Sequence, residues 1–150
     1  MFAPKKILVP TDFSVYSDNA FNVAIDIAKQ YKSGIYLLHV IDDGFQQCAV
    51  DYCINEDVLQ RIYQESGKSA QDKLQKDAKK FDHDTSGVEI TYDVKRGIPY
   101  EEILKEQEEK KIDLMVMASH GKTGILHNLM GSVVEKVIRR VKCPLLLIRN

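Results

Sequence analysis

The chain has 150 residues, of which 21 are basic and 22 acidic, and its formal net charge at pH 7 is −1. A chain of this length suits one domain over residues 1–150, whose core can be stable without disulfides or bound metal. The balanced charge lacks the basic excess of nucleic-acid-binding proteins, and no apolar run approaches the roughly 18 residues that cross a membrane, so we expect neither partner.

Residues 1–6 lead directly into a strand pattern instead of a signal peptide, so we expect a cytoplasmic protein. Residues 7–10 form an apolar run that ends at a proline, which is typical of a short buried parallel strand. Ser14 then suits the N-cap of a helix whose apolar residues share one face as far as Tyr31. A second apolar strand is expected over residues 35–41.

A mixed polar loop is expected over residues 42–55, and a long amphipathic helix follows it. Residues 88–94 alternate between apolar and polar, which predicts an edge strand with one face in water. Pro99 suits the first position of the next helix, which carries Ile103 and Leu104. The apolar stripe of the long helix consists of Val58, Ile62, Ala70, Leu74, Ala78 and Phe81.

Residues 114–118 and 145–148 are two further apolar strands, and a helix is expected between them over 132–141. Strands therefore alternate with helices along the whole chain. This alternation predicts an α/β fold, a five-stranded, mostly parallel, doubly wound sheet of order 3-2-1-4-5 with helices on both faces. The side chains of the last helix that should point inward are Val133, Val137, Ile138 and Val141.

In a doubly wound sheet, ligands bind beyond the carboxyl ends of the strands, where the strand order reverses. Here that point lies between the first and fourth strands, so the loops over 10–14 and 118–132 should line the site. The second loop contains glycines that let a ligand approach the backbone, and it ends at a helix start, which favours an anion. It indicates a phosphate-binding loop, although a glycine-punctuated surface loop stays open as an alternative.

Two familiar phosphate sites are excluded by the residues in these loops. A P-loop would need a glycine at position 116, where Val116 stands inside a strand. A response-regulator receiver would need an aspartate after the third strand, where the chain has Lys95-Arg96-Gly97. Asp12, at the end of the first strand, could accept hydrogen bonds from a ribose or adenine or could bind local backbone N–H groups, and both interpretations stay open.

The three cysteines do not suggest a disulfide framework, because their number is odd. Cys48 and Cys53 are interpreted as loop thiols, since no second ligand cluster accompanies them to form a metal or redox site. The histidines also lack a metal-ligand spacing, so no metal-binding residue is predicted. His120 is the histidine best placed for a function, because it lies in the second loop.

Four segments of the chain carry motifs that occur together: residues 9–14, 97–99, 113–121 and 131–149. In order and over essentially the whole chain, they resemble the universal stress protein family. Nucleotide-binding members of that family carry the signature G-x2-G-x9-G-[ST]. Its spacing here falls on Ala118, Gly121, Gly131 and Ser132, with alanine in place of the first glycine. A methyl group at position 118 is compatible with binding if the backbone there is extended.

The resemblance implies particular contacts to an adenine nucleotide. Thr11 and Asp12 would face the nucleoside, and Val40 would offer main-chain hydrogen bonds to adenine. The phosphates would be held by Gly121, Gly131, Ser132 and Val133. The implied ligand is ATP, or ADP or AMP, and a Mg²⁺ or Mn²⁺ ion could accompany it. The expected binding residues, none of them catalytic or metal-ligating, are Pro10, Thr11, Asp12, Val40, Met117, Ala118, Gly121, Gly131, Ser132 and Val133.

Three functions fit these observations: a nucleotide-binding regulatory or stress-response protein, a slow ATPase that uses the same site, and a nucleotide-free dimeric interaction protein. We favour the first, because the signature spacing favours binding and no general base for fast catalysis is evident. The resemblance also implies a homodimer formed through the terminal strand Leu145–Ile148, whose edge would otherwise be open for pairing.

Overall fold

The computed structural model describes residues 1–43, 55–81, 85–122 and 130–149. Cys48 and Cys53 lie outside the described residues, as do most of the loop expected over 42–55 and residues 123–129 of the second loop. The helices and strands are β1 (Lys6–Pro10), α1 (Val15–Tyr31), β2 (Gly34–Asp42), α3 (Glu56–Lys79), β3 (Ile90–Gly97), α4 (Pro99–Glu109), β4 (Leu114–Ala118), α5 (Ser132–Ile138) and β5 (Leu145–Ile148).

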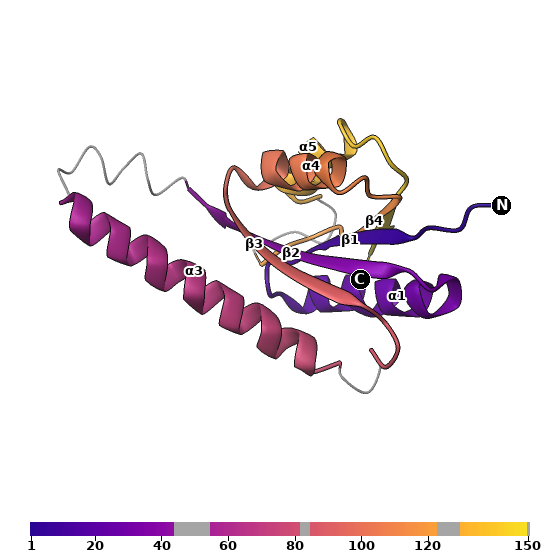
Figure 1. The fold of residues 1–150 in the computed structure, drawn as a ribbon. Helices are drawn as coiled ribbons and strands as arrows, with labels where there is room; N and C mark the ends of the chain where they lie inside the picture. The colour runs from indigo at the N-terminus through magenta and orange to yellow at the C-terminus, as the bar shows by residue number, and fades with distance from the viewer. Residues whose placement is uncertain (44–54, 82–84, 123–129, 150) are drawn as a thin grey trace.

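The strands form one parallel sheet in the order β3-β2-β1-β4-β5, which confirms the predicted fold class (Figure 1). The apolar runs of β1 and β4 lie at its centre, where both faces of a strand are covered, and all five residues of β4 are buried. β3 lies at one edge and is only partly buried, as its alternating pattern predicted. The strand order reverses between β1 and β4, so the loops after these two strands open at the same point.

The helices cover both faces of the sheet, with α1 and α3 on one face and α4 and α5 on the other (Figure 1). Successive side chains of a strand point to opposite faces. Ile7 and Val9 therefore pack with α1 and α3, whereas Leu8 packs with α4 and α5. Within the described ranges, no helix is both long and apolar enough to cross a membrane.

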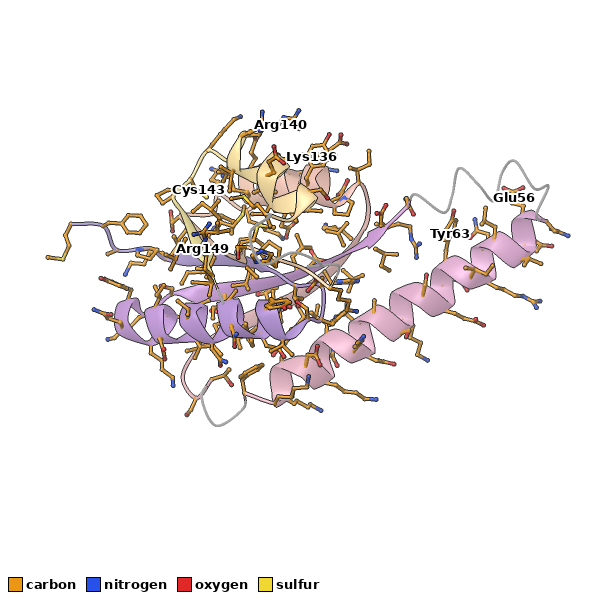
Figure 2. All side chains as sticks on the ribbon, turned by 180° about the vertical axis from the view of Figure 1, so that it is seen from behind. Glu56, Tyr63, Lys136, Arg140, Cys143 and Arg149 are labelled. Carbon is orange, nitrogen blue, oxygen red and sulfur yellow. The ribbon has the colours of Figure 1, made fainter. Side chains whose placement is uncertain are left out.

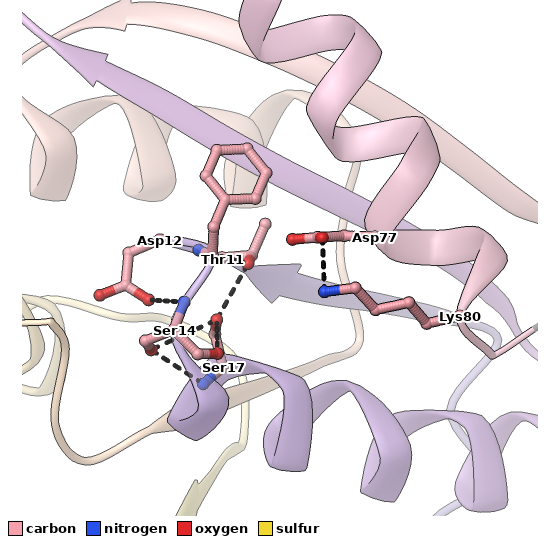
Figure 3. Close-up of polar contacts among 7 residues, drawn as sticks. Thr11, Asp12, Ser14, Ser17, Asp77 and Lys80 are labelled. Atoms are coloured by element: carbon pink, nitrogen blue, oxygen red, sulfur yellow. Dashed lines mark hydrogen bonds and ion pairs between the residues drawn. The ribbon is translucent and has the colours of Figure 1, made fainter.

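Serine and threonine hydroxyls fix the turn from β1 into α1. Ser14 is the N-cap of α1, and its side chain accepts the N–H of Ser17 at 3.2 Å (Figure 3). The Thr11 hydroxyl shares a hydrogen bond with the Ser17 hydroxyl at 3.0 Å and accepts the N–H of Phe13 at 3.1 Å. The loop that follows β1 is therefore held by its own side chains before any ligand arrives.

The long helix α3 differs from the prediction in how much of its apolar stripe is buried. Ala70, Leu74 and Ala78 pack against the sheet, as expected. Val58 and Ile62 are 47% and 41% exposed, because the N-terminal half of α3 extends beyond the end of the sheet (Figure 2). Their place in the helical pattern is as predicted, and only the later part of the stripe packs on the sheet.

Two smaller predictions also need correction. The strand β3 begins at Ile90 and not at residue 88, because the N–H of Val88 closes a turn onto the carbonyl of Thr85 at 2.9 Å. The helix α5 ends at Ile138, and that side chain is 40% exposed instead of pointing inward. Val134 takes the buried position, since it lies one turn before Val137 on the face that packs on the sheet.

Candidate functional site

A cavity of about 500 Å³ opens where β1, β2 and β4 end and α5 begins. It lies at the point where the strand order reverses, as the topology requires. All ten residues predicted from the sequence line it, although they come from four separate parts of the chain. They are Pro10, Thr11, Asp12, Val40, Met117, Ala118, Gly121, Gly131, Ser132 and Val133.

The cavity has an apolar side and a polar side. The apolar side chains come from β2, β4 and the starts of α4 and α5: Leu38, Val40, Pro99, Ile103, Met117, Val133 and Val134. The polar groups come from the loops after β1 and β4 and from the start of α5: Thr11, Asp12, His120, Lys122 and Ser132. Such a division suits a ligand with a flat apolar part and a charged part.

Several lining residues were not predicted as site residues. Leu38 and His39 come from β2, and Pro99 and Ile103 come from the start of α4, which packs beside that strand end. Their exposure to the cavity depends on where β1 ends relative to its neighbours. A pattern within a single segment does not predict that relation. Pro99 belongs to one of the segments that carry the family resemblance, and this was the only indication that α4 contributes to the site.

The backbone of Val40 lacks a strand partner on the cavity side. The pairing of β1 with β2 ends at Pro10 and Leu38, and the N–H of Thr11 still donates to the Leu38 carbonyl at 2.8 Å. β2 then continues to Asp42. Alternate residues of a strand direct their N–H and C=O groups to the same neighbour, so those of Val40 point where β1 has ended. Within the described residues, no strand pairs with Val40 on that side.

Asp12 ties the two loops of the site together. Its Oδ1 accepts the N–H of Ser14 at 3.0 Å and its Oδ2 accepts the N–H of Lys122 at 2.8 Å (Figure 3 shows the first bond). Burial alone would raise the pKa of Asp12, but the hydrogen bonds from Ser14, Lys122 and Ser17 together outweigh it and hold the pKa below its usual value. The carboxylate is ionised at neutral pH, and here it binds local backbone N–H groups, one of the two interpretations left open by the sequence.

Gly121 and Gly131 are glycines for different reasons. A Cβ at Gly121 would lie 2.6 Å from Oδ2 of Asp12, so the loop can close onto that carboxylate only without a side chain. Gly131 has φ −61° and ψ 144°, which any residue can adopt, and a Cβ there would make an ordinary contact of 3.6 Å with Val134. Nothing in the described part of the chain requires a glycine at 131, which fits a ligand that approaches the backbone at this point.

The start of α5 offers backbone donors to the cavity. The N–H of Gly131 donates to the Ser119 carbonyl at 3.0 Å, so the first N–H groups without an intrahelical acceptor are those of Ser132 and Val133. Among the residues with a described position, no side chain caps this helix start. Ser132 and Val133 both line the cavity.

Ala118, the departure from the glycine signature, is compatible with the site. It is the last residue of β4 and therefore has an extended backbone. The non-glycine residues with positive φ within the described ranges are Phe13, Lys32 and Lys111. A methyl group at position 118 thus causes no backbone strain.

His39 and His120 both line the cavity. His39 Nδ1 lies 2.8 Å from the Thr11 carbonyl, and because a carbonyl can only accept, Nδ1 carries the hydrogen. Burial lowers the pKa of His39, so this ring is neutral at pH 7. His120 Nδ1 shares a hydrogen bond with the Ser119 hydroxyl at 2.7 Å, and its Nε2 is buried without a hydrogen-bond partner among the described residues.

The residues that the structure describes around the cavity do not form a metal site of their own. In the described part of the chain, no group of three or more histidine, cysteine, aspartate or glutamate side chains is placed to hold a metal ion. Asp12 has both carboxylate oxygens engaged by N–H groups.

Comparison of the sequence with models of known protein families identifies the family of this chain. The model of the universal stress protein family matches residues 4–149. The chain belongs to the universal stress protein family. The match covers every strand and helix of the sheet, so the family accounts for the whole described fold.

Similar universal stress proteins occur in Methanocaldococcus jannaschii. MJ0531 is 36% identical over 147 residues, which cover 97% of this chain and 82% of the relative. MJ0577 is 32% identical over 158 residues, which cover 97% of this chain and 95% of the relative. The solved structure of MJ0577 superposes with a TM-score of 0.79 at 31% identity and covers 100% of this chain and 98% of that one.

A more distant universal stress protein was solved in complex with cAMP. It superposes with a TM-score of 0.66 at 23% identity, covering 98% of each chain. At this level of identity the likeness shows a shared fold.

Proposed function

We propose that this universal stress protein binds an adenine nucleotide, ATP in the first place, in the cavity between β1 and β4, and that it acts as a regulatory or stress-response module. One observation carries the proposal: ten residues chosen from sequence motifs meet around one cavity that has an apolar side and a polar side. The solved complex of another universal stress protein with cAMP supports it, since the same fold there holds an adenine nucleotide.

The apolar side of the cavity suits the adenine ring. Leu38, Ile103 and Met117 offer the apolar surface on which a flat base can pack. Val40 adds one N–H donor and one C=O acceptor that β1 has left unpaired. Adenine carries an acceptor and a donor side by side on one edge, so a single extended residue can bind both.

The polar side suits the phosphates. The free N–H groups of Ser132 and Val133 and the hydroxyl of Ser132 face the cavity at the start of α5, and the bare Gly131 lets a phosphate come close. Asp12 contributes by holding the two loops in place through Ser14 and Lys122. Its low pKa makes it a weak base, which favours nucleotide binding over fast hydrolysis.

We further propose that two copies pair through β5. Within the described residues β5 pairs only with β4, so its outer edge is free to add a strand. Leu146 on this strand is 38% exposed, which leaves apolar surface for a second copy to cover.

A thermal-shift experiment tests the proposed function. A ligand that binds only the folded protein at 100 times its dissociation constant adds about 2.7 kcal/mol, so ATP should raise the melting temperature by several degrees. Gly131→Leu should fold, because its backbone angles suit any residue, and should lose the ATP shift because the side chain occupies the phosphate position.

Gly67→Ala is the matched control, since a Cβ at that position on α3 meets nothing within 4 Å. Its ATP shift should equal that of the unaltered protein. A shift that persists in Gly131→Leu would contradict the proposed phosphate position, and no shift at millimolar ATP in the unaltered protein would contradict nucleotide binding.

A further inference from the structure

The ring of Phe13 brings two lysine side chains together beside the cavity. Lys73 Nζ, from α3, lies 4.5 Å from the centroid of the ring, and Lys122 Nζ, from the loop after β4, lies 5.7 Å from it. Both distances are typical of cation–π contacts. Two ammonium groups from residues far apart in the sequence therefore contact the same aromatic ring.

This convergence of like charge has no counter-ion in the described part of the chain. Neither Lys73 nor Lys122 forms an ion pair with a described carboxylate. Asp12, which accepts the backbone N–H of Lys122, has both oxygens bound by backbone N–H groups. Like charges held near each other cost free energy unless an anion joins them.

The backbone at Phe13 also indicates that the ring is placed there at a cost. Phe13 has φ 63°, a left-handed conformation that bulky residues rarely adopt. Its ring packs on His39 with centroids 4.3 Å apart, and His39 lines the cavity. The N–H of Phe13 is held by the Thr11 hydroxyl, so the position of the ring is fixed by the loop.

We propose that Lys73 and Lys122, held by Phe13, form an anion subsite that binds the outer phosphates of a nucleoside triphosphate. This inference rests on the proposed function, and it adds a ligand class: nucleotides with phosphates beyond the first are preferred over monophosphates. Lys122 lines the cavity, and Lys73, from α3, contacts the same Phe13 ring. Phosphates that leave the start of α5 toward α3 would pass within reach of both ammonium groups.

The subsite binds phosphate oxygens through two flexible lysine side chains. Each ammonium group offers three donors and a full positive charge to the phosphate oxygens. The single phosphate of AMP would use the N–H groups at the start of α5 and would not need Lys73. A charge-assisted hydrogen bond of this kind contributes roughly tenfold in affinity, so losing Lys73 should weaken ATP binding by about that factor.

The experiment is isothermal titration calorimetry with AMP and with ATP on the full chain and three variants. Lys73→Gln and Lys122→Gln should each weaken ATP binding roughly tenfold, and Lys73→Gln should leave AMP binding unchanged. Lys79→Gln is the control, because this exposed lysine lies on the same helix and removes the same charge without touching Phe13. It should bind both nucleotides like the unaltered protein.

Each outcome separates the subsite from the proposed function. An ATP preference over AMP that disappears in Lys73→Gln supports the subsite. Equal ATP and AMP affinities in the unaltered protein, or an ATP preference that survives in Lys73→Gln and Lys122→Gln, would overturn it while nucleotide binding stands. If neither nucleotide binds to the unaltered protein, the proposed function itself fails, and the subsite fails with it.

Discussion

Glu106 is a titratable residue whose side chain is buried. Its side chain, on α4, is 2% exposed, and its Oε2 has no hydrogen-bond partner among the described residues. Lys95 Nζ lies 3.8 Å from that oxygen but also 3.4 Å from Asp93, so one ammonium group serves two carboxylates. Burial, and then the charge of Asp93, raise the pKa of Glu106. The folded protein therefore binds a proton at Glu106 more readily than the unfolded chain does.

The sign of this effect gives a prediction for Glu106→Gln. Because the pKa of Glu106 is higher in the folded protein, its protonation favours folding at pH values below the unfolded-state pKa of about 4.3. This contribution to stability is lost as the pH rises through the folded-state pKa. A neutral glutamine avoids that loss, so it should increase the free energy of unfolding at pH 7 by on the order of 1 kcal/mol and change it little at pH 4. Urea denaturation at both pH values measures the difference.

Glu65→Gln on the exposed face of α3 is the control for Glu106→Gln, and it should leave stability nearly unchanged at both pH values. The explanation would be wrong if Glu106→Gln destabilised the protein more at pH 7 than at pH 4. That result would mean that the ion pair with Lys95 outweighs the cost of burying the carboxylate.

At the scale of the element, the hydrogen bonds of β5 show which of its residues face the open edge. The N–H of Met115 donates to the Pro144 carbonyl and that of Ser119 to the Ile148 carbonyl, each at 2.9 Å. Alternate residues of a strand face the same neighbour, so Leu146 bonds toward β4. Leu147 presents its N–H to the outer edge.

Two proline substitutions separate pairing within the chain from pairing between copies. Leu147→Pro removes an outer N–H, which an edge strand tolerates, so the protein should stay folded and become monomeric. Leu146→Pro removes an N–H on the β4 side and should lower the stability of the fold itself, by about 3 kcal/mol or less. Sedimentation velocity at micromolar concentration and circular dichroism measure the two effects.

Two experimental results would contradict the proposed dimer. If the unaltered protein sediments as a monomer at micromolar concentration, β5 does not pair as proposed. The same conclusion follows if Leu147→Pro folds and still sediments as a dimer.

At the scale of the whole molecule, the sequence predicted the sheet because four strands are separate apolar runs and the third alternates between apolar and polar residues. Ser14 and Pro99 also mark the starts of two helices. The position of the site followed from the strand order, since only the loops after β1 and β4 meet at its reversal. The exposed half of α3 was not predictable, because periodicity shows which face of a helix is apolar and not how far the sheet beneath it extends.

Other parts of the site depend on distances between segments and could not be predicted from local patterns. The free backbone of Val40 results from β2 being longer than β1, which is a property of their register. The contacts of Phe13 with Lys73 and Lys122 join three segments that share no motif. The cavity role of His39 depends on the same turn after β1.

An NMR titration that follows backbone amide signals during ATP addition tests the nucleotide site most directly. We predict that the amide signals of Val40, Gly121, Ser132 and Val133 shift together and saturate at one ATP per chain, because these groups line the cavity. The amide of Asp57, on the part of α3 that extends beyond the sheet, should not move. Saturating shifts that leave Val40 and Ser132 unchanged, or none at millimolar ATP, would contradict nucleotide binding between β1 and β4.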